Sequence, residues 1–238
     1  MIYVMSDIHG NTSRFNSIME QINLQSSDTL YILGDVIDRY PDGIKLLRRI
    51  MKTDNMQMLL GNHEYMMLEA LVNNNSEDII TQFAKEDAIH LWYRNGGRVT
   101  HNYLKHIRKE LRGEVFDYLN SLPTNIEITV NDIKYLLVHG SPEANYKKYN
   151  NRYSTCKEYS VWKRWQIEDK APDGYTLIFG HTPTVHFSHE MPPKIYFTCS
   201  TIGIDCGGGF LDGRLACLRL DDMKIFYSEE SAKDTEKK

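Results

Sequence analysis

The sequence predicts a layered α/β fold, and two observations support this prediction. Over residues 2–60, short runs rich in β-branched, aromatic and leucine residues alternate with helical patterns. This βαβαβ order is typical of sheets covered by helices. In addition, motifs of metal-ligating type directly follow several of the runs, and functional loops of an α/β sheet lie outside the carboxyl ends of its strands. At 238 residues, one domain is expected.

Eight segments have the composition of strands. Six are well marked: 2–5, 29–33, 57–60, 134–138, 175–179 and 214–220. Two are weaker: 195–197 and 224–227. Near-continuous apolarity, as at residues 136–138, indicates central strands that are covered on both faces. The glycine-rich segments 207–209 and 212–213 predict antiparallel hairpins in the last third of the chain.

Helices are expected between the first three strands, with Thr12 capping the first and Asp42 the second. Apolar residues recur at helical spacing in both, at Phe15, Ile18, Met19 and Ile22 and then at Ile44, Leu47, Ile50 and Met51. Residues 65–122 are helical in pattern and carry no ligand-type motif, so they are interpreted as an insertion bordering the site. The charged residues 229–238 are predicted to be a disordered tail after a domain at 1–228.

Composition restricts the classes of partner. The formal net charge is −4 and no basic tract occurs, which argues against binding long nucleic acid. No apolar run approaches ~18 residues, so we expect no membrane-spanning helix and no membrane partner. The four cysteines form no Cys-x-x-Cys pair and are expected to be small, buried or half-buried residues. A cytoplasmic protein with reduced thiols is therefore expected.

Five short motifs combine carboxylate, amide and imidazole side chains. They are Asp7-Ile8-His9, Gly34-Asp35-Val36-Ile37-Asp38-Arg39, Gly61-Asn62-His63-Glu64, Val138-His139-Gly140 and Gly180-His181-Thr182. Their candidate ligands are Asp7, His9, Asp35, Asn62, His139 and His181. Hard oxygens mixed with imidazole suit manganese, iron or zinc and poorly suit calcium. Because the loops converge on one sheet edge, we expect a site for two transition-metal ions, which hydrolyse phosphate esters by activating water.

Each candidate has an ordinary alternative when taken alone. An aspartate after a strand is often a turn former or helix cap, and a lone histidine is often a hydrogen-bonded core or surface residue. The occurrence of all five motifs in this order argues against that reading for the set. The remaining histidines are expected to be such core or surface residues: His90, His101, His106, His186 and His189.

Other phosphatase chemistries can be tested against the sequence. A cysteine phosphatase needs Cys-x5-Arg, and none of the four cysteines has arginine at that spacing. An aspartyl-phosphate enzyme of the Asp-x-Asp-x-Thr type needs aspartate where His9 stands. No Gly-x4-Gly-Lys-Ser/Thr loop is present, so a P-loop nucleotide hydrolase is excluded.

The motifs resemble the phosphoprotein phosphatase family of calcineurin-like metallophosphoesterases, and most closely its small bacterial and phage serine/threonine phosphatases. The resemblance runs from residue 7 to 181, and residues 204–207 are similar to the family's closing segment. It implies a layered α-β-β-α sandwich of two mixed sheets flanked by helices, with an inserted helical segment around residues 65–122. Tyr40 departs from the glycine of many relatives and Ser6 replaces a common glycine, which affects the expected substrate range rather than the ligand set.

The resemblance also implies ligand roles. Asp7, His9 and a bridging Asp35 would hold the first metal ion. Asp35 would share the second ion with Asn62, His139 and His181. Manganese is the first choice, with iron or zinc as alternatives. A hydroxide bridging the two ions would be the nucleophile.

Four further residues receive catalytic roles from the resemblance. His63 would act as general acid, and Asp38 would pair with it and favour the imidazolium. Arg39 would hold the phosphate oxygens. Arg164, in the Trp-x-Arg segment 162–164, would be the second phosphate-binding arginine. The alternative for this segment is that Trp162 anchors packing while Arg164 is solvated.

The resulting hypotheses belong to three classes. The first is a serine/threonine protein phosphatase, because Gly-Asn-His-Glu is similar to that branch of the family. The second is a hydrolase of dinucleoside polyphosphates or other small phosphoesters, whose diadenosine tetraphosphate branch has Gly-Asn-His-Asp instead. A non-catalytic binding scaffold is disfavoured because every ligand histidine and His63 are present. The expected partner is a phosphorylated protein or small phosphoester, and the oligomeric state stays open.

Overall fold

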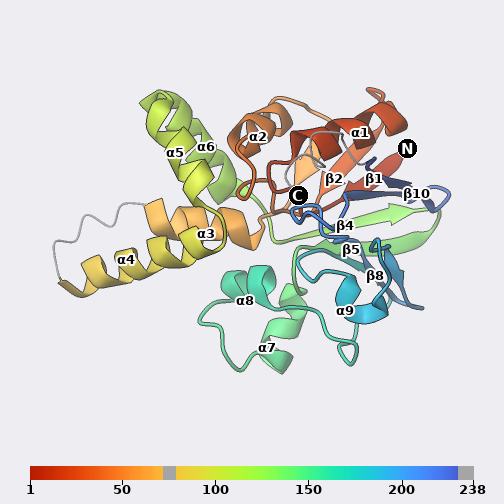
Figure 1. The fold of residues 1–238 in the computed structure, drawn as a ribbon. Helices are drawn as coiled ribbons and strands as arrows, with labels where there is room; N and C mark the ends of the chain where they lie inside the picture. Colours follow the sequence, from red (N-terminus) through yellow and green to blue (C-terminus); the bar gives the residue numbers. More distant parts are fainter. Residues whose placement is uncertain (72–78, 230–238) are drawn as a thin grey trace.

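Two five-stranded mixed sheets form the centre of the molecule in the computed structural model, which describes residues 1–71 and 79–229 (Figure 1). This confirms the predicted α/β class with two mixed sheets flanked by helices. The strands are β1 (Ile2–Met5), β2 (Thr29–Ile32), β3 (Met56–Met58), β4 (Asn125–Val130), β5 (Ile133–Val138), β6 (Thr176–Phe179), β7 (Tyr196–Phe197), β8 (Thr201–Gly203), β9 (Ala216–Arg219) and β10 (Lys224–Tyr227).

Helices lie between these strands along the described chain. The α-helices are α1 (Thr12–Ile22), α2 (Gly43–Met51), α3 (Asn62–Leu71), α4 (Ile79–Arg94), α5 (Arg98–His106), α6 (Lys109–Ser121), α7 (Tyr146–Tyr149), α8 (Cys156–Trp162) and α9 (Val185–Ser188). A 3₁₀ turn, η1 (Glu143–Asn145), precedes α7. Within the described ranges, no helix is long and apolar enough to cross a bilayer.

The sheet topology brings the motif loops to one edge. The first sheet has the order β10-β9-β1-β2-β3, in which β1, β2 and β3 are parallel. The second has the order β4-β5-β6-β8-β7, in which β5, β6 and β8 are parallel. Parallel neighbours end at the same side of a sheet, so the loops after β1, β2 and β3 meet there, as do those after β5 and β6.

Alternating side chains place one apolar layer between the sheets and one on each outer face. Along β1, Tyr3 and Met5 pack toward the helices, while Val4 packs into the layer between the sheets. Along β5, Leu137 enters the same middle layer, whereas Leu136 packs on the outer side with Trp165 and Phe179. This period-two alternation gives the α-β-β-α layering that the resemblance implied.

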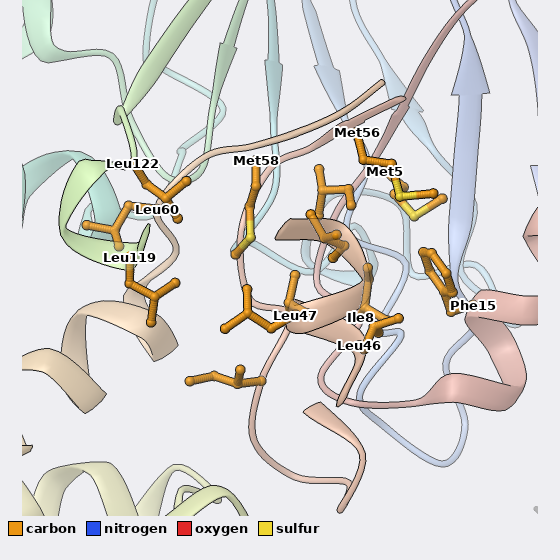
Figure 2. Packing of buried hydrophobic residues seen from close by; sticks show 14 of the residues in the cluster. Met5, Ile8, Phe15, Leu46, Leu47, Met56, Met58, Leu60, Leu119 and Leu122 are labelled. Carbon is orange, nitrogen blue, oxygen red and sulfur yellow. The ribbon is translucent and has the colours of Figure 1, made fainter. Parts of the chain in front are cut away.

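The helical insertion shares the main core. Leu119 and Leu122, at the end of α6, lie beside Leu60 of the β3–α3 connection in Figure 2. Trp92 of α4 belongs to the same cluster and is fully buried. Full burial of one such leucine contributes roughly 1.5–3 kcal/mol, so the insertion is anchored to the sheet-bearing part by its own apolar residues.

Several local predictions were wrong. β4 and β8 were missed, since β4 has a mixed polar and apolar edge-strand sequence and β8 has only 3 residues. Antiparallel pairs do occur in the last third of the chain, at β7–β8 and β9–β10. Residues 207–213 are not a hairpin turn, however, because they connect β8 and β9 of different sheets. The cap of α1 is Asn11, which accepts a hydrogen bond from Arg14 N (3.1 Å), and not Thr12. Asp42 occupies the N-cap position of α2, as predicted, but its side chain makes no capping hydrogen bond.

The cysteine and tail predictions had mixed outcomes. Cys206 and Cys217 are buried and Cys156 is half-buried, as expected, but Cys199 is exposed. The predicted tail lies outside the described residues apart from residue 229.

Candidate metal centre

The loops after β1 and β2 are joined by backbone hydrogen bonds beyond the ends of their strands. Asp7 N donates to Gly34 O (3.2 Å), His9 N donates to Asp35 O (2.9 Å), and Gly10 N continues the series. The parallel pairing of the strands therefore extends into the two loops. This extension places the side chains of Asp7, His9 and Asp35 next to one another.

Six non-glycine residues of the motifs have left-handed backbone conformations. They are Asp7, His9, Asp35, Asp38, Arg39 and His181, with φ between 52° and 72°. Such values are uncommon outside glycine, although aspartate and histidine adopt them more readily than most residues. Each costs roughly 1–2 kcal/mol, so the surrounding contacts must enforce them. Strain concentrated in one loop cluster is characteristic of a functional site.

The first group of candidate ligand atoms surrounds His9. Its Nε2 lies 3.8 Å from Asp35 Oδ2 and 3.9 Å from Asp7 Oδ1. Its Nδ1 is 3.2 Å from the carbonyl oxygen of Ile37, which leaves Nε2 as the ligating atom. His63 also approaches, with Nε2 3.8 Å from Asp35 Oδ2. All these side chains are buried.

The second group surrounds His139. Its Nε2 lies 2.9 Å from Asn62 Oδ1 and 3.4 Å from Asp35 Oδ1, while Nδ1 faces Leu33 O at 2.6 Å. The ring of His181 is 5.0 Å from that of His139, and its Nε2 contacts Trp162 O at 3.1 Å. His181 is thus left with Nδ1 as its available ligand atom.

Asp35 belongs to both groups. Ligand atoms of Asp35, His9 and His63 lie within 4.8 Å of one another, as do those of Asp35, His139 and His181. Oδ2 of Asp35 faces His9 and His63, whereas Oδ1 faces His139. One carboxylate is therefore positioned to bridge two cations.

Electrostatics fits the same donor set. Burial holds the pKa of Asp35 well above its usual range, and the nearby charges of Asp7 and Glu64 act in the same direction despite the opposing charge of His63. Burial, followed by the charge of a neighbouring histidine, lowers the pKa values of His9 and His181 well below normal. Neutral imidazoles are the ligating form, and crowded carboxylates are stabilised by a cation. The residues present therefore fit divalent transition metals.

The predicted acid pair is in direct contact. His63 Nδ1 lies 2.8 Å from Asp38 Oδ2, and both side chains are buried. Burial alone lowers the pKa of His63, but the charge of Asp35 and the hydrogen bond to Asp38 outweigh it, so the pKa is raised. The protonated imidazole is therefore favoured at a pH where an isolated histidine is largely neutral.

The two predicted arginines lie near different candidate ligands, since the charge of Arg39 acts on His9 and that of Arg164 acts on His181. Arg39 is half-buried, with its guanidinium 4.3 Å from the ring centroid of Phe210. Arg164 is exposed and lines a hollow of about 550 Å³ together with Trp162 and His181. Its charge contributes, after burial and His139, to the lowered pKa of His181. Lys163, by contrast, is paired with a carboxylate, that of Asp169 at 2.9 Å.

Glu64 has a clear structural role. Its buried carboxylate accepts four backbone hydrogen bonds, from the N–H groups of Asp35, Val36, Ile37 and Gly61. It thereby fixes the loop that carries Asp35 and the turn that precedes Asn62. Both oxygens of Glu64 are occupied by these donors.

Sequence reasoning did not assign three residues that border the site. Asp205 is buried beside Asp7, and burial together with that charge raises its pKa to about 8. Trp92 and Thr100, from the helical insertion, hydrogen-bond to the side chain and backbone of Asp38. The available signals were indirect: an aspartate in the closing segment 204–207, and a tryptophan shortly before Gly96 and Gly97.

Comparison with known proteins gives a consistent result. The profile described as calcineurin-like phosphoesterase matches residues 1–201. Serine/threonine-protein phosphatase 2 of Salmonella typhimurium is 30% identical over 228 residues, covering 92% of each chain. The symmetrical bis(5'-nucleosyl)-tetraphosphatase of Delftia acidovorans is 41% identical over 71 residues, which cover 29% of this chain and 25% of that relative.

Solved structures show the same fold. One described as a putative diadenosine tetraphosphatase superposes with a TM-score of 0.62 and 18% sequence identity. The match covers 97% of this chain and 94% of that structure.

Proposed function

The chain belongs to the calcineurin-like phosphoesterase family of hydrolases, and from this premise we propose that it is a metal-dependent phosphomonoester hydrolase. Its first proposed substrates are phosphoserine and phosphothreonine in proteins. The observation that carries the proposal is the placement of Asp35, whose two oxygens face two separate groups of buried nitrogen and oxygen donors. That arrangement suits a dinuclear centre.

The proposed ligands follow from this geometry. Asp7, His9 and Asp35 would hold one ion, and Asn62, His139 and His181 would complete the other around Asp35. When bound, the two ions would activate water for attack on phosphorus and stabilise the charge of the reacting phosphate. Manganese is the first proposed metal, with iron or zinc as alternatives, because mixed oxygen and imidazole donors suit all three.

The remaining residues act on the substrate directly. His63, held by Asp38, would donate its proton to the leaving oxygen. Arg39 would bind the phosphate oxygens, and Arg164 would do so from the hollow that it lines with Trp162. Trp162, which packs edge-on against His181 with ring centroids 6.2 Å apart, would form the wall between that hollow and the ligand group.

Two substrate classes are supported by different observations. The alignment with serine/threonine-protein phosphatase 2 extends over nearly the whole of both chains. The higher identity to the nucleosyl-tetraphosphatase is confined to a short segment, yet the overall fold also matches a structure with a related description. Glu64 accepts hydrogen bonds from backbone N–H groups. The presence of glutamate here, where the diadenosine tetraphosphate branch has aspartate, therefore does not itself select a substrate. Dinucleoside polyphosphates are therefore the second proposed class.

A parallel assay distinguishes the two. Manganese-loaded protein is incubated with a phosphoserine peptide and, separately, with diadenosine tetraphosphate. We expect the larger kcat/KM on the peptide, and a larger value on the dinucleotide would replace the first class by the second. No turnover of either with manganese, iron, zinc, cobalt or nickel would refute the hydrolase proposal.

The general acid is tested by His63→Asn, with the exposed His106→Asn as matched control. His63→Asn should lower kcat by on the order of 10² or more, while calorimetry shows that manganese still binds. The control should match the wild type. Unchanged turnover in His63→Asn would contradict the assignment of His63.

A further inference from the structure

The segment from Trp92 in α4 to Thr100 in α5 contacts the loop that carries Asp38 at three points. The indole Nε1 of Trp92 donates to Asp38 Oδ2 (2.8 Å). The backbone N–H of Asp38 donates to Thr100 Oγ1 (3.1 Å), and that of Arg39 donates to Gly96 O (3.3 Å). One segment of the insertion thus makes three hydrogen bonds with Asp38 and Arg39, two successive residues whose backbone is left-handed.

The segment is shaped to hold the indole. Trp92 is completely buried, and a Cβ at Gly97 would lie 2.3 Å from its Nε1. His101 also lines the indole, because its ring stacks on that of Trp92 with centroids 5.6 Å apart. His101 in turn contacts the hydroxyl of Tyr93 at 2.5 Å. The indole N–H therefore has a fixed direction, toward Asp38.

Asp38 depends on this contact. Its Oδ2 is shared by His63 Nδ1 and Trp92 Nε1, each at 2.8 Å. Its buried Oδ1 has no hydrogen-bond partner in the part of the chain that the structure describes. Two donors that converge on one oxygen define where that oxygen lies. With only one of them present, rotation of the carboxylate would leave the imidazole of His63 with a poorly directed partner.

We propose that the helical insertion positions the acid pair, with Trp92 and Thr100 holding Asp38 so that Asp38 orients His63. Trp92 and Thr100 are positioning residues, because they act through Asp38 and not on the substrate. This inference rests on the proposed role of His63 as general acid. It assigns the insertion a part in protonation of the leaving group, beyond its packing in the core.

The test compares two leaving groups. An alkoxide leaving from phosphoserine requires protonation, whereas p-nitrophenolate requires little, so a misplaced acid lowers kcat on the phosphoserine peptide more than on p-nitrophenyl phosphate. Trp92→Phe removes the N–H and keeps an aromatic ring in the pocket. Trp165→Phe is the matched control, because Trp165 is a buried tryptophan that stacks on Phe179. Thr100→Val removes the acceptor at nearly constant volume.

For Trp92→Phe we expect about a tenfold fall in kcat on the peptide, in line with partial loss of general acid catalysis. KM should stay near the wild-type value, and the ratio of peptide to p-nitrophenyl phosphate turnover should fall severalfold. Thr100→Val should lower the same ratio, which provides the test if Trp92→Phe does not fold. Trp165→Phe should leave the ratio unchanged.

The outcomes distinguish the positioning role of Trp92 and Thr100 from the general-acid role of His63. If His63→Asn lowers the ratio but folded Trp92→Phe and Thr100→Val do not, the positioning inference is wrong and the general acid stands. Equal falls on both substrates would indicate a merely structural role for Trp92 and would also overturn it. If His63→Asn itself leaves the ratio unchanged, the acid assignment fails, and the inference fails with it.

A spectroscopic measurement is independent of turnover. The chain has 3 tryptophans, and in zinc-loaded, diamagnetic protein the indole N–H signal of Trp92 is identified by its absence in Trp92→Phe. A hydrogen bond to a carboxylate moves this signal downfield and slows its exchange with solvent. In Asp38→Ala it should move upfield and exchange faster. An unchanged signal would show that Trp92 does not donate to Asp38.

Discussion

Replacing Glu64 by glutamine tests how the ligand loop is held. The carboxylate accepts from Val36 N and Ile37 N on Oε1, at 2.9 and 3.2 Å, and from Asp35 N and Gly61 N on Oε2, at 2.9 and 3.2 Å. A glutamine of the same shape keeps one oxygen. Its NH₂ group then faces two backbone N–H groups, so these two buried donors lose their acceptor.

The magnitude follows from the number of lost bonds. A buried donor without an acceptor costs about 1–3 kcal/mol, so two cost about 2–6 kcal/mol. Glutamine also avoids the burial of charge that raises the pKa of Glu64, which offsets part of the loss. We therefore expect the free energy of unfolding to fall by about 3 kcal/mol. For a chain of this size, that corresponds to a fall in Tm of about 6–12 °C.

Urea denaturation and thermal melts of metal-free protein measure this change. The matched control is Glu69→Gln on the same helix α3, because Glu69 is exposed. It should change stability by no more than about 0.5 kcal/mol. A loss of unfolding free energy below about 1 kcal/mol in Glu64→Gln would refute the reasoning. It would show that the two backbone N–H groups find other acceptors and do not depend on Glu64. Manganese affinity should also fall, because Asp35 lies on the released loop.

Three further changes test other parts of the site. Asp38→Asn should shift the alkaline limb of the kcat–pH profile to lower pH, because Asp38 helps to raise the pKa of His63 and the protonated form is the active acid. Manganese at 100 times its Kd should stabilise metal-free protein by about 2.7 kcal/mol, and EDTA should reverse the resulting rise in Tm. Arg14→Met should lower the free energy of unfolding in urea by about 2–4 kcal/mol, because the buried guanidinium donates to the carbonyls of Gly208, Phe210 and Leu211.

The grouping of the candidate ligands could be anticipated because its signals are local in sequence. Asp7 and Asp35 each follow a short apolar run, and the hydrogen-bonding pattern of parallel strands carries that order into space. An aspartate or histidine after a buried strand is therefore informative before any coordinates are known. The helices α1 and α2 were equally visible, since their apolar residues recur at a period that only a helix brings to one face.

What the sequence did not reveal depends on contacts between distant segments. Strand β8 has only 3 residues, and its place beside β6 is set by the sheet it joins. The glycines at 207–209 resemble a hairpin turn, but they cross from one sheet to the other and approach His9 closely. Trp92 is 54 residues away from Asp38, and its spacing in α4 is that of an ordinary core residue.

Hydrogen bonds around the loops give a structural role to motif residues that are not candidate ligands. Ligand side chains are useful only if the loops stay in left-handed conformations that an isolated chain would avoid. Ser6, Glu64 and Thr100 supply the compensating hydrogen bonds, to the Asp7 carboxylate and to the backbone of residues 35–38. A substitution at these positions is therefore expected to disturb the loops without removing a candidate ligand. The insertion extends this principle, because its Trp92 acts on the Asp38 side chain from outside the motif-bearing loops.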